Sequence, residues 1–558
     1  MEPVGVTVVD PDGRAHHARW RDAAELRCGP WTILARRGAA SPVAAAPVHW
    51  ALAAAGRRPA GRVVLHLRGA PAPTGVVHRE GWQSWSATGP RLERRPAGCP
   101  PWAARSLDGG VARPAGASDA VAVVGTRDGA LAVGFLSARR HFGWVSWGGT
   151  GGAVRCTASL EGVMVAREPL RLDPVGWFAG PTPGAALAAY ADAVGRRNRA
   201  RAAGPAVMGW CSWTAHGPDL TAARVKDTVA RLAGWRDLLR VIQVDDGYQA
   251  ATGDWLTTRP EVGAPLAGLI ETIAGAGFVA GLWAAPFAAG RGSRVARDHP
   301  TWLLRDTQGA PVVCMPWMDE AAALDCSQPE VREHLRATFA TIRGLGVSYL
   351  KADFGFAAAA AGHHKEAGWT RAAALAAGLD AVRAGVGDEA HLLICGCPWL
   401  TAVGVADSFR VAADVTRRWR PRWDATVPVP RGASAPAAGN AAVGSLRRAW
   451  MHRRLWVNDP DCLLRTDTTA PVREALTAVA AAAGGTVILS DPAARLDDRD
   501  HAAVADLIQQ QARLDRPMTA ECRTRGDRVI FTRDAPGGRL TLDLGRRRGG
   551  VRVSGAGS

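Results

Sequence analysis

The chain has 558 residues, of which 47% are hydrophobic and 21% charged, which is typical of globular proteins with a large apolar core. A single small module, a collagen-like repeat and wholesale disorder are therefore excluded, and the length allows about three domains. The formal net charge is +17, but the basic residues are dispersed and form no basic helix, so we expect no nucleic-acid partner.

The cysteines and the N-terminal residues bear on the cellular compartment. Ten cysteines are spread along the chain, a density that favours reduced thiols. Residues 1–20 include no apolar run of signal-peptide type, and no stretch of about 20 apolar residues lacks a charge. We therefore expect a cytoplasmic protein without a membrane partner. Cys395 and Cys397 form a lone C-x-C pair without further ligands at metal-binding spacing, so no metal is predicted. No organic cofactor is predicted either.

Residues 1–185 are predicted to form an N-terminal β-sandwich domain. Short apolar runs broken by Gly, Pro and Asp are typical of antiparallel strands. The clearest runs are 63–67, 120–125, 130–136 and 162–166. The pattern changes near residue 183, and residues 185–201 are predicted to be a helix that leads into the next domain.

Residues 186–495 alternate short apolar strands with amphipathic segments. The predicted strands are 206–213, 239–246, 278–285, 347–354, 391–396, 408–415, 455–459 and 485–491, and the clearest helices are 220–232, 264–275, 328–345, 371–384 and 468–483. Strands buried on both faces and joined by helices indicate an α/β fold with a parallel sheet. Eight such units match a (β/α)8 TIM barrel. The alternative, an open doubly wound sheet, usually has a glycine-rich turn after its first strand, and residues 209–213 contain none.

Two further segments complete the predicted organisation. Residues 426–446, rich in Ala, Pro and Gly, are predicted to be a long loop after the sixth strand. Residues 496–558 return to strand patterns and are predicted to form a small C-terminal β domain.

Carboxylates recur where three of the predicted barrel strands end. Asp245 and Asp246 end the second strand, Asp353 ends the fourth after Lys351, and Asp414 ends the sixth after Arg410. One such Asp could equally be a loop or helix cap. Three strands that end this way at the carboxyl face of one barrel favour an active site, because active sites of such barrels lie at that face.

Two of these carboxylates suit the cleavage of a glycosidic bond. One must attack the anomeric carbon, and the other must protonate the leaving oxygen and later deprotonate water. We expect Asp353 and Asp414 to be this pair. Lys351 lies on the same strand face as Asp353, and its positive charge favours an ionised nucleophile. Burial and repulsion between carboxylates favour a protonated Asp414, whereas Arg410 opposes this if the two side chains touch.

Tryptophans near the predicted strand ends could supply flat apolar faces for a sugar ring. The chain has 22 Trp and only 3 Tyr. Stacking on sugar and packing in the core both remain open for each of the six tryptophans at these positions. They are Trp210, Trp213, Trp255, Trp283, Trp302 and Trp399.

Several ordered motifs together resemble the α-galactosidases (melibiases) of glycoside hydrolase family 36. The motifs are EGWQSWS at 80–86, GWCSW at 209–213, QVDDGYQ at 243–249, GLWAAP at 281–286, DHPTW at 298–302, YLKADF at 349–354, residues 395–414 and WVNDPD at 456–461. The resemblance implies the same three-part fold as the strand pattern. It also implies that the substrate is a small-molecule or oligosaccharide α-galactoside.

The resemblance also implies roles for single residues. Asp353 corresponds to the nucleophile and Asp414 to the acid/base. The other implied substrate-binding residues are Asp245 and Asp246 on the O4 and O6 side of galactose, Lys351 and Arg410 at ring hydroxyls or the nucleophile, Cys395 and Trp283 in the pocket wall, and Trp85 from the first domain. Two stretches depart from the family, Phe354-Gly355 after the nucleophile and Cys397-Pro398-Trp399, and they leave the acceptor side open.

The sequence therefore predicts a retaining α-galactosidase that works through a covalent galactosyl-Asp353 intermediate. Two alternatives keep the same scaffold, namely galactosyl transfer as in raffinose-synthase-like relatives and hydrolysis of α-N-acetylgalactosaminides. A third alternative is a catalytically silent carbohydrate-binding protein. The number of subunits is not predicted.

Overall fold

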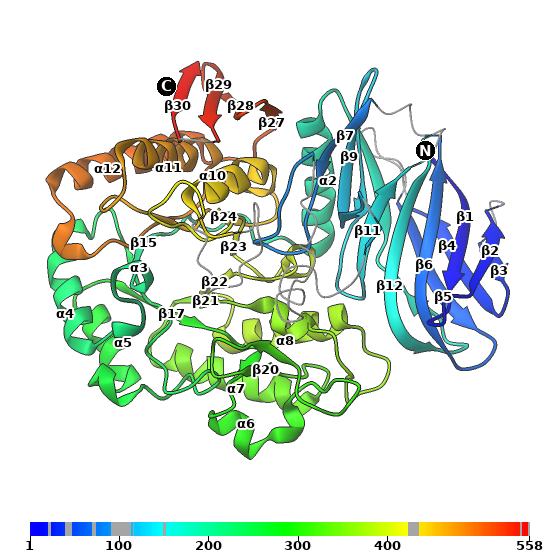
Figure 1. Ribbon diagram of the computed structural model, residues 1–558, viewed down its shortest axis with the longest axis horizontal. Helices are drawn as coiled ribbons and strands as arrows, with labels where there is room; N and C mark the ends of the chain where they lie inside the picture. Colours follow the sequence, from blue (N-terminus) through cyan, green and yellow to red (C-terminus); the bar gives the residue numbers. More distant parts are fainter. Residues whose placement is uncertain are drawn as a thin grey trace.

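The computed structural model describes residues 1–20, 24–38, 47–69, 74–90, 113–114, 116–148, 152–421, 435–546 and 549–555. Two antiparallel sheets account for the described strands before residue 181, and Figure 1 shows them side by side, in blue and cyan, away from the rest of the chain. The first sheet runs β2 (Ala15–Arg19), β1 (Glu2–Val9), β6 (Arg58–Arg68), β12 (Val154–Val165), β11 (Phe142–Trp147), β8 (Ser118–Asp119). The second runs β3 (Glu25–Cys28), β4 (Trp31–Arg37), β5 (Val48–Ala54), β14 (Val175–Gly180), β10 (Gly129–Phe135), β9 (Val121–Thr126), β7 (Gly75–Arg79), and β13 (Leu170–Arg171) pairs with β5.

Buried and more exposed side chains alternate with the expected period of two in β4 and in most of β6, whereas β9 and β10 are buried on both faces. In β6, Ala60, Val63, Leu65 and Leu67 are fully buried, and the residues between them are partly or fully exposed. All four strands predicted for this part of the chain are present, within β6, β9, β10 and β12.

Helix α2 (Pro183–Asn198) connects the two antiparallel sheets to the remainder of the chain. Thr182 caps its N-terminus through its hydroxyl, Pro183 occupies the first turn, and Arg199 ends it in a left-handed conformation. The buried Tyr190 hydroxyl donates to the Phe135 carbonyl oxygen in β10 at 2.8 Å, which fixes the helix on that strand.

A nine-stranded parallel sheet forms the centre of the chain from residue 208 to residue 489. Its order is β24 (Val457–Asp459), β23 (Ser408–Arg410), β22 (His391–Ile394), β21 (Tyr349–Ala352), β17 (Val279–Ala284), β16 (Val241–Val244), β15 (Met208–Cys211), β26 (Val487–Leu489), β25 (Cys462–Leu463). The two outermost strands, β24 and β25, are separated in the chain only by Pro460 and Asp461. The eight strands predicted for this part of the chain are all present, each shorter than predicted.

One face of this sheet carries a separate cluster of buried side chains. It consists of Val207, Cys211, Val241, Tyr349, Leu393 and Ile488. These residues come from β22, β21, β16, β15, β26 or the residue before β15, so strands that are not neighbours in the sheet meet through their side chains. The sheet is therefore strongly curved around an apolar interior.

Helices lie between the strands of the parallel sheet. They are α3 (Trp213–His216), α4 (Ala222–Arg231), α5 (Leu266–Gly275), α6 (Arg294–Asp298), α7 (Pro329–Gly344), α8 (Arg371–Val386), α9 (Trp399–Ala402), α10 (Ala438–Arg447) and α11 (Ala470–Ala483). The five predicted helices are present as α4, α5, α7, α8 and α11. In α7, Val331, Leu335, Phe339 and Ile342 are buried at helical spacing, which explains why the pattern could be recognised.

An insertion after β17 was not predicted. It contains α6 and a small antiparallel sheet of β18 (Ala288–Ala289), β20 (Ala321–Ala323) and β19 (Val313–Met315). These strands have two or three residues each, too short for a period to be visible in sequence.

Two predicted segments differ from the structure. The predicted loop at 426–446 contains α10, whose residues Ala438, Ala441, Ala442 and Leu446 are buried; residues 426–434 lie outside the described residues. The predicted β domain at 496–558 begins with α12 (Asp498–Leu514), because Asp497 caps this helix and Val504, Leu507 and Leu514 bury one face. The four antiparallel strands that follow agree with the prediction, and they are β27 (Ala520–Arg525), β28 (Arg528–Ala535), β29 (Gly538–Gly545) and β30 (Val551–Gly555).

Nine cysteines lie in the described ranges, and all nine are free thiols. Cys99 lies outside these ranges. No helix within the described residues is both long and apolar enough to cross a bilayer.

Candidate active site

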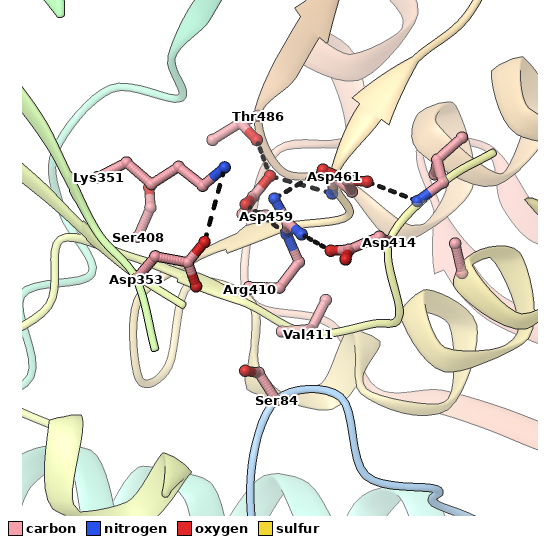
Figure 2. A network of polar contacts seen from close by, with 12 residues as sticks. Ser84, Lys351, Asp353, Ser408, Arg410, Val411, Asp414, Asp459, Asp461 and Thr486 are labelled. Atoms are coloured by element: carbon pink, nitrogen blue, oxygen red, sulfur yellow. Dashed lines mark hydrogen bonds and ion pairs between the residues drawn. The ribbon is translucent and has the colours of Figure 1, made fainter. Parts of the chain in front are cut away.

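The parallel register brings the predicted site residues to one layer of the sheet. Trp283 on β17 stands opposite Lys351 on β21, and Arg410 on β23 stands opposite Asp459 on β24. Asp245, Asp353 and Asp414 follow the carboxyl ends of β16, β21 and β23. Figure 2 shows the Lys351–Asp353 pair beside the contacts that Arg410 makes with Asp414 and two further carboxylates.

Asp353 is held by two N–H groups. The Trp283 indole Nε1 donates to its Oδ2 at 3.1 Å, and the Phe354 backbone N donates to its Oδ1 at 2.7 Å. The Lys351 ammonium lies 4.0 Å from Oδ2. Phe354 has a φ of 51°, an uncommon left-handed conformation for a bulky residue, so the backbone directly after Asp353 is strained.

Lys351 has a closer partner than Asp353. Its Nζ lies 3.0 Å from Oδ2 of the buried Asp245. Burial alone would lower the pKa of Lys351, but attraction to Asp245 and Asp353 outweighs it and raises the pKa well above its usual value. Lys351 is therefore a fixed positive charge between these two carboxylates.

The two neighbouring aspartates after β16 have different surroundings. Both oxygens of Asp245 are engaged inside the protein, Oδ2 by Lys351, Gln243 and Cys211, and Oδ1 by the Asp246 backbone N. Asp246 is half-buried, and its Oδ1 accepts a 2.6 Å bond from Gln249 Nε2. Burial raises the pKa of Asp246. Asp246 thus presents a carboxylate at the surface of the site, whereas Asp245 orients Lys351.

Asp414 and Arg410 do touch. The Arg410 Nη1 lies 2.8 Å from Oδ1 of Asp414. Burial among the surrounding groups, together with repulsion by Asp461, raises the pKa of Asp414 to about 6, although the Arg410 charge opposes this shift. The Asp414 side chain is nevertheless 51% exposed, as a carboxyl on the wall of a recess can be, where solvent reaches it from one side and protein encloses it on the others.

Two residues of this network, Asp459 and Asp461, were not predicted as site residues. Arg410 Nε bonds Asp459 Oδ2 at 2.8 Å, and Arg410 Nη2 lies 2.6 Å from Asp461 Oδ1. The four-residue spacing to Asp414 reveals one partner of Arg410, but the other two come from β24 and the turn after it. The signal available in sequence was the pair of carboxylates in N-D-P-D at 458–461, at the end of a predicted strand.

Cys395 follows β22 and is fully buried. Burial and the nearby Asp353 raise the pKa of its thiol well above the usual value, so the sulfur is a neutral, compact group in the wall of the site.

Trp85 reaches the site from the first antiparallel part of the chain. Its ring packs edge-on against Phe354 and Phe356, with centroids 5.6 and 6.2 Å apart. The loop that carries it is tied to the end of β22, because the Ser84 backbone N donates to the Cys397 carbonyl at 3.2 Å. The structure therefore brings Trp85 next to Phe354, the residue that follows Asp353.

The six candidate tryptophans divide by burial. Trp210, Trp255, Trp283 and Trp399 are buried core residues, with Trp283 also bonded to Asp353. Trp302 is half-buried and stacks on His299 at 3.7 Å. Trp213 is 49% exposed, and Trp317, which was not predicted, is 51% exposed and lies 6.2 Å from the Phe354 ring.

Within the described residues, no group of three or more His, Cys, Asp or Glu side chains is arranged to hold a metal ion. The carboxylates of the network are instead bonded to Arg410 and Lys351. A parallel α/β sheet that presents carboxylates at its carboxyl end, beside β-rich parts, is an arrangement that glycoside hydrolases use.

Comparison with known proteins agrees with this class. The Melibiase family model matches residues 212–376. The solved structure of TtGalA, an α-galactosidase from Thermus thermophilus in complex with p-nitrophenyl α-D-galactopyranoside, is 26% identical with a TM-score of 0.67, over 90% of this chain and 95% of that one. A stachyose complex of TtGalA gives a TM-score of 0.68 at 26% identity, over 86% of this chain and 97% of that one.

A more distant neighbour shares the fold. A variant of AgaA, a GH36 α-galactosidase from Geobacillus stearothermophilus in complex with 1-deoxygalactonojirimycin, is 13% identical with a TM-score of 0.65, over 97% of this chain and 81% of that one. The resemblance predicted from the sequence motifs is thus confirmed: the chain is similar to the family 36 α-galactosidases.

Proposed function

We propose that the protein is a retaining α-galactosidase that hydrolyses terminal α-D-galactosyl residues of oligosaccharides. The observation that carries the proposal is the contrast between two carboxylates beside Arg410 and Lys351. Asp353 is nearly buried and fixed by two N–H donors, whereas Asp414 is half-exposed and its raised pKa favours a proton. One group suits attack on carbon and the other suits proton transfer to a leaving oxygen.

The proposal includes a closed (β/α)8 barrel in residues 186–495, between a β-sandwich in 1–185 and a smaller C-terminal unit in 496–558. Two observations support closure of the barrel. The strands at the two edges of the sheet, β24 and β25, are separated by only two residues, and side chains from five strands meet in the interior. In such a barrel, β24, Pro460, Asp461 and β25 together are the seventh strand.

In the first half of the reaction, an Asp353 oxygen bonds to the anomeric carbon of galactose while the bond from that carbon to the leaving oxygen breaks. The proton of Asp414 moves to the leaving oxygen. The indole N–H of Trp283 and the backbone N–H of Phe354 orient the attacking carboxylate throughout.

In the second half, the ionised Asp414 takes a proton from water. The water oxygen bonds to the anomeric carbon, and the ester bond to Asp353 breaks. Two inversions at one carbon retain the α-configuration. Asp414 can accept and return the proton because its pKa of about 6 lies near neutrality.

The neighbouring groups would recognise galactose. TtGalA has been solved with p-nitrophenyl α-D-galactopyranoside and with stachyose, and we propose the same class of substrate here. Asp246 would accept hydrogen bonds from sugar hydroxyls, with Asp245, Lys351 and Arg410 completing the polar side of the pocket. Trp283, Cys395 and Trp85 would form its walls. A glucoside, which cannot make the same bonds to O4, would leave buried polar groups unpaired.

Replacement of the nucleophile tests the proposal. Asp353→Gly is expected to lower kcat for p-nitrophenyl α-D-galactopyranoside by roughly 1,000-fold or more, because no covalent intermediate can form. Azide should restore turnover and give β-galactosyl azide, since azide attacks once in the space that the carboxylate leaves. Product configuration is measured by NMR.

The matched control is Asp388→Gly, which removes an exposed carboxylate in the turn before β22, at the amino end of that strand. It should leave turnover unchanged. Near-normal activity of Asp353→Gly would rule out the proposed nucleophile, and a wild-type protein that binds galactosides without cleaving them would indicate a carbohydrate-binding protein instead.

The raised pKa of Asp414 predicts the pH dependence. The acid must be protonated in the first half-reaction, so kcat/KM should fall as pH rises through about 6. The basic limb should disappear in Asp414→Asn when the substrate has an activated aryl leaving group. A basic limb that persists unchanged in this variant would mean that another group supplies the proton.

A further inference from the structure

Asp461 lies beside the proposed acid/base but has no role in the mechanism above. It stands in the two-residue break between β24 and β25, and its φ of 77° is in the left-handed region that side-chain-bearing residues seldom adopt. Strain of this kind persists where the surrounding contacts impose it. The contacts made by Asp461 therefore deserve a functional explanation.

Both oxygens of Asp461 are engaged by groups adjoining Asp414 (Figure 2). Its Oδ2 accepts a 2.5 Å bond from the backbone N of Val415, the residue after Asp414. Its Oδ1 lies 2.6 Å from Nη2 of Arg410, whose Nη1 bonds Asp414. One side chain thus fixes both the backbone and the cation next to the Asp414 carboxyl.

The charge of Arg410 is shared among three carboxylates. Nε of Arg410 pairs with Asp459, Nη2 pairs with Asp461 and Nη1 pairs with Asp414. Arg410 holds the pKa of Asp459 below its usual range despite burial, so Asp459 is ionised. With Asp461 also ionised, Arg410 contributes one positive charge next to Asp414, and its other two partners, Asp459 and Asp461, contribute two negative charges.

We propose that Asp461 is a positioning residue for the acid/base step: it pins the Val415 backbone, holds one arm of Arg410, and places a negative charge beside Asp414 so that Asp414 keeps its proton. The inference rests on the proposed function and extends it. An arginine that bonded Asp414 alone would favour the carboxylate and remove the proton donor. Asp459 and Asp461 together cancel that effect.

Burial raises the pKa of Asp461 too, so a proton shared by the two carboxyls could reside on Asp461 or on Asp414. Each oxygen of Asp461 accepts a short hydrogen bond, one from Arg410 and one from the Val415 N–H. Neither donor can act as an acceptor, so both bonds favour the ionised form of Asp461. Among the described residues, Arg410 alone donates a hydrogen bond to the Asp414 carboxyl, and that side chain is half-exposed. The proton therefore resides on Asp414.

The other ionisable groups around the pair are fixed by their own contacts. They are Asp353 and Lys351 from β21, Asp459 from β24, Cys395 after β22 and Cys462 at the start of β25. Both thiols have pKa values raised well above the usual value by burial, and Lys351 is likewise raised by its carboxylate partners, so these three groups do not change charge near neutral pH.

Asp461→Asn tests the proposal. Asparagine adopts the left-handed conformation readily and keeps the shape of the side chain, but it removes the negative charge. The basic limb of the kcat/KM profile should move to lower pH by about one unit or more, and kcat/KM at pH 7 should fall about tenfold. The loss should be larger for an alkyl α-galactoside than for the p-nitrophenyl one, since a poorer leaving group needs more protonation.

Two further variants separate charge from structure. Asp461→Glu keeps the charge, so its basic limb should stay near that of the wild type even if the rate falls. Asp467→Asn is the matched control, because Asp467 also has a left-handed φ of 55° and pairs with arginines, Arg417 and Arg495, outside the site. It should behave as wild type.

The carboxyl of Asp414 can also be observed without turnover. Its titration, followed by ¹³C NMR in the full-length protein with Asp414→Asn identifying the signal, should move to lower pH in Asp461→Asn. An unchanged titration would overturn the inference even if the protein is an active galactosidase. A shifted titration in a protein without hydrolase activity would uphold the inference about Asp461 and reject the proposed function. A uniform loss of activity at every pH would assign Asp461 a structural role only.

Discussion

At the residue scale, the closest polar neighbours of Asp353 are N–H groups. The Trp283 indole donates at 3.1 Å, whereas the Lys351 ammonium lies 4.0 Å away and is closer to Asp245. The sequence pattern suggested Lys351 as the main influence on Asp353, because two residues on one strand face were known to be near each other. The indole comes from β17, and its direction could not be read from the chain.

Trp283→Phe should therefore lower kcat without a matching change in KM. The variant keeps an aromatic ring in the core but loses a hydrogen bond to a charged group, worth roughly 1.5–3 kcal/mol, which corresponds to roughly a tenfold to hundredfold loss of rate if it is made fully in the transition state. Steady-state kinetics with p-nitrophenyl α-D-galactopyranoside measures the effect.

Trp450→Phe is the control for this substitution. Trp450 is equally buried, but its Nε1 has no hydrogen-bond partner in the part of the chain that the structure describes, so its loss should leave kcat unchanged. If both variants lose the same activity, general loosening of the core would explain the result and the indole bond would have no specific role.

At the element scale, two glycines with positive φ flank strand β22, and they differ in how closely other residues approach them. Gly387 precedes the strand with a φ of 75° and open space around the position of a Cβ. Gly396 follows it with a φ of 55°, and a Cβ there would lie 2.8 Å from the Trp85 ring and 3.1 Å from the backbone of Phe354. Only Gly396 allows the first part of the chain and the Asp353 loop to approach each other.

Gly396→Ala is expected to reduce activity more than stability. Both Gly396→Ala and Gly387→Ala place a side chain in a left-handed conformation, at a cost of about 1–2 kcal/mol in the free energy of unfolding. Gly396→Ala must in addition displace Trp85 or Phe354. Denaturant melts should show a loss of stability in both variants, larger in Gly396→Ala because of this displacement, and only Gly396→Ala should lower kcat/KM. Equal activities would show that Trp85 and Phe354 can shift without effect.

The elements were predictable where burial imposes a period. The strands of the parallel sheet are apolar runs and the five predicted helices have clear amphipathic spacing, so local sequence was enough to place them. Helix α10 was missed because its Ala-rich and Gly-rich sequence resembles a loop, and only Asn440 and Arg447 add long polar side chains opposite its buried residues. Helix α12 was missed because the strands that follow it dominated the interpretation of the last 60-odd residues.

The candidate site was predictable in part, from the positions of carboxylates at the ends of predicted strands. A carboxylate at the end of a parallel strand must lie at one face of the sheet, so Asp245, Asp353 and Asp414 could be grouped without a structure. Which cation bonds which carboxylate depends on side chains from strands far apart in sequence. Arg410 therefore appeared to have one partner and has three, and the charge balance around Asp414 could not be derived from spacing.

At the scale of the whole molecule, one buried ion pair joins the first part of the chain to the parallel sheet. Arg448 follows α10, and its guanidinium bonds Glu80 Oε1 at 2.7 Å through Nε. It also donates to the carbonyls of Ser84 and Ser86, beside Trp85, and to the carbonyl of Val411, next to Arg410. The loop that carries Trp85 is thus held to the segment that connects Arg410 to Asp414.

Breaking this pair should destabilise the protein strongly. Arg448→Met leaves the fully buried Glu80 without its cation, at a cost of roughly 3–5 kcal/mol in the free energy of unfolding. The double variant Glu80→Gln/Arg448→Met should recover part of that loss, because no buried charge is then left unpaired. Arg231→Met, which removes an exposed helix pair with Asp227, should change stability little.

The Glu80–Arg448 pair predicts a pH dependence of the free energy of unfolding, which the double variant Glu80→Gln/Arg448→Met should remove. Burial would raise the pKa of Glu80, but Arg448, assisted by His78, lowers it below its usual value. A carboxyl whose pKa is lower in the folded than in the unfolded state adds stability above its unfolded pKa, and this stability is lost as pH falls through its folded pKa. Denaturant melts between neutral and acidic pH should therefore converge for wild type and the double variant as the pH falls. Parallel curves would show that Glu80 does not titrate on unfolding, and the pair would then hold Trp85 in place by geometry alone.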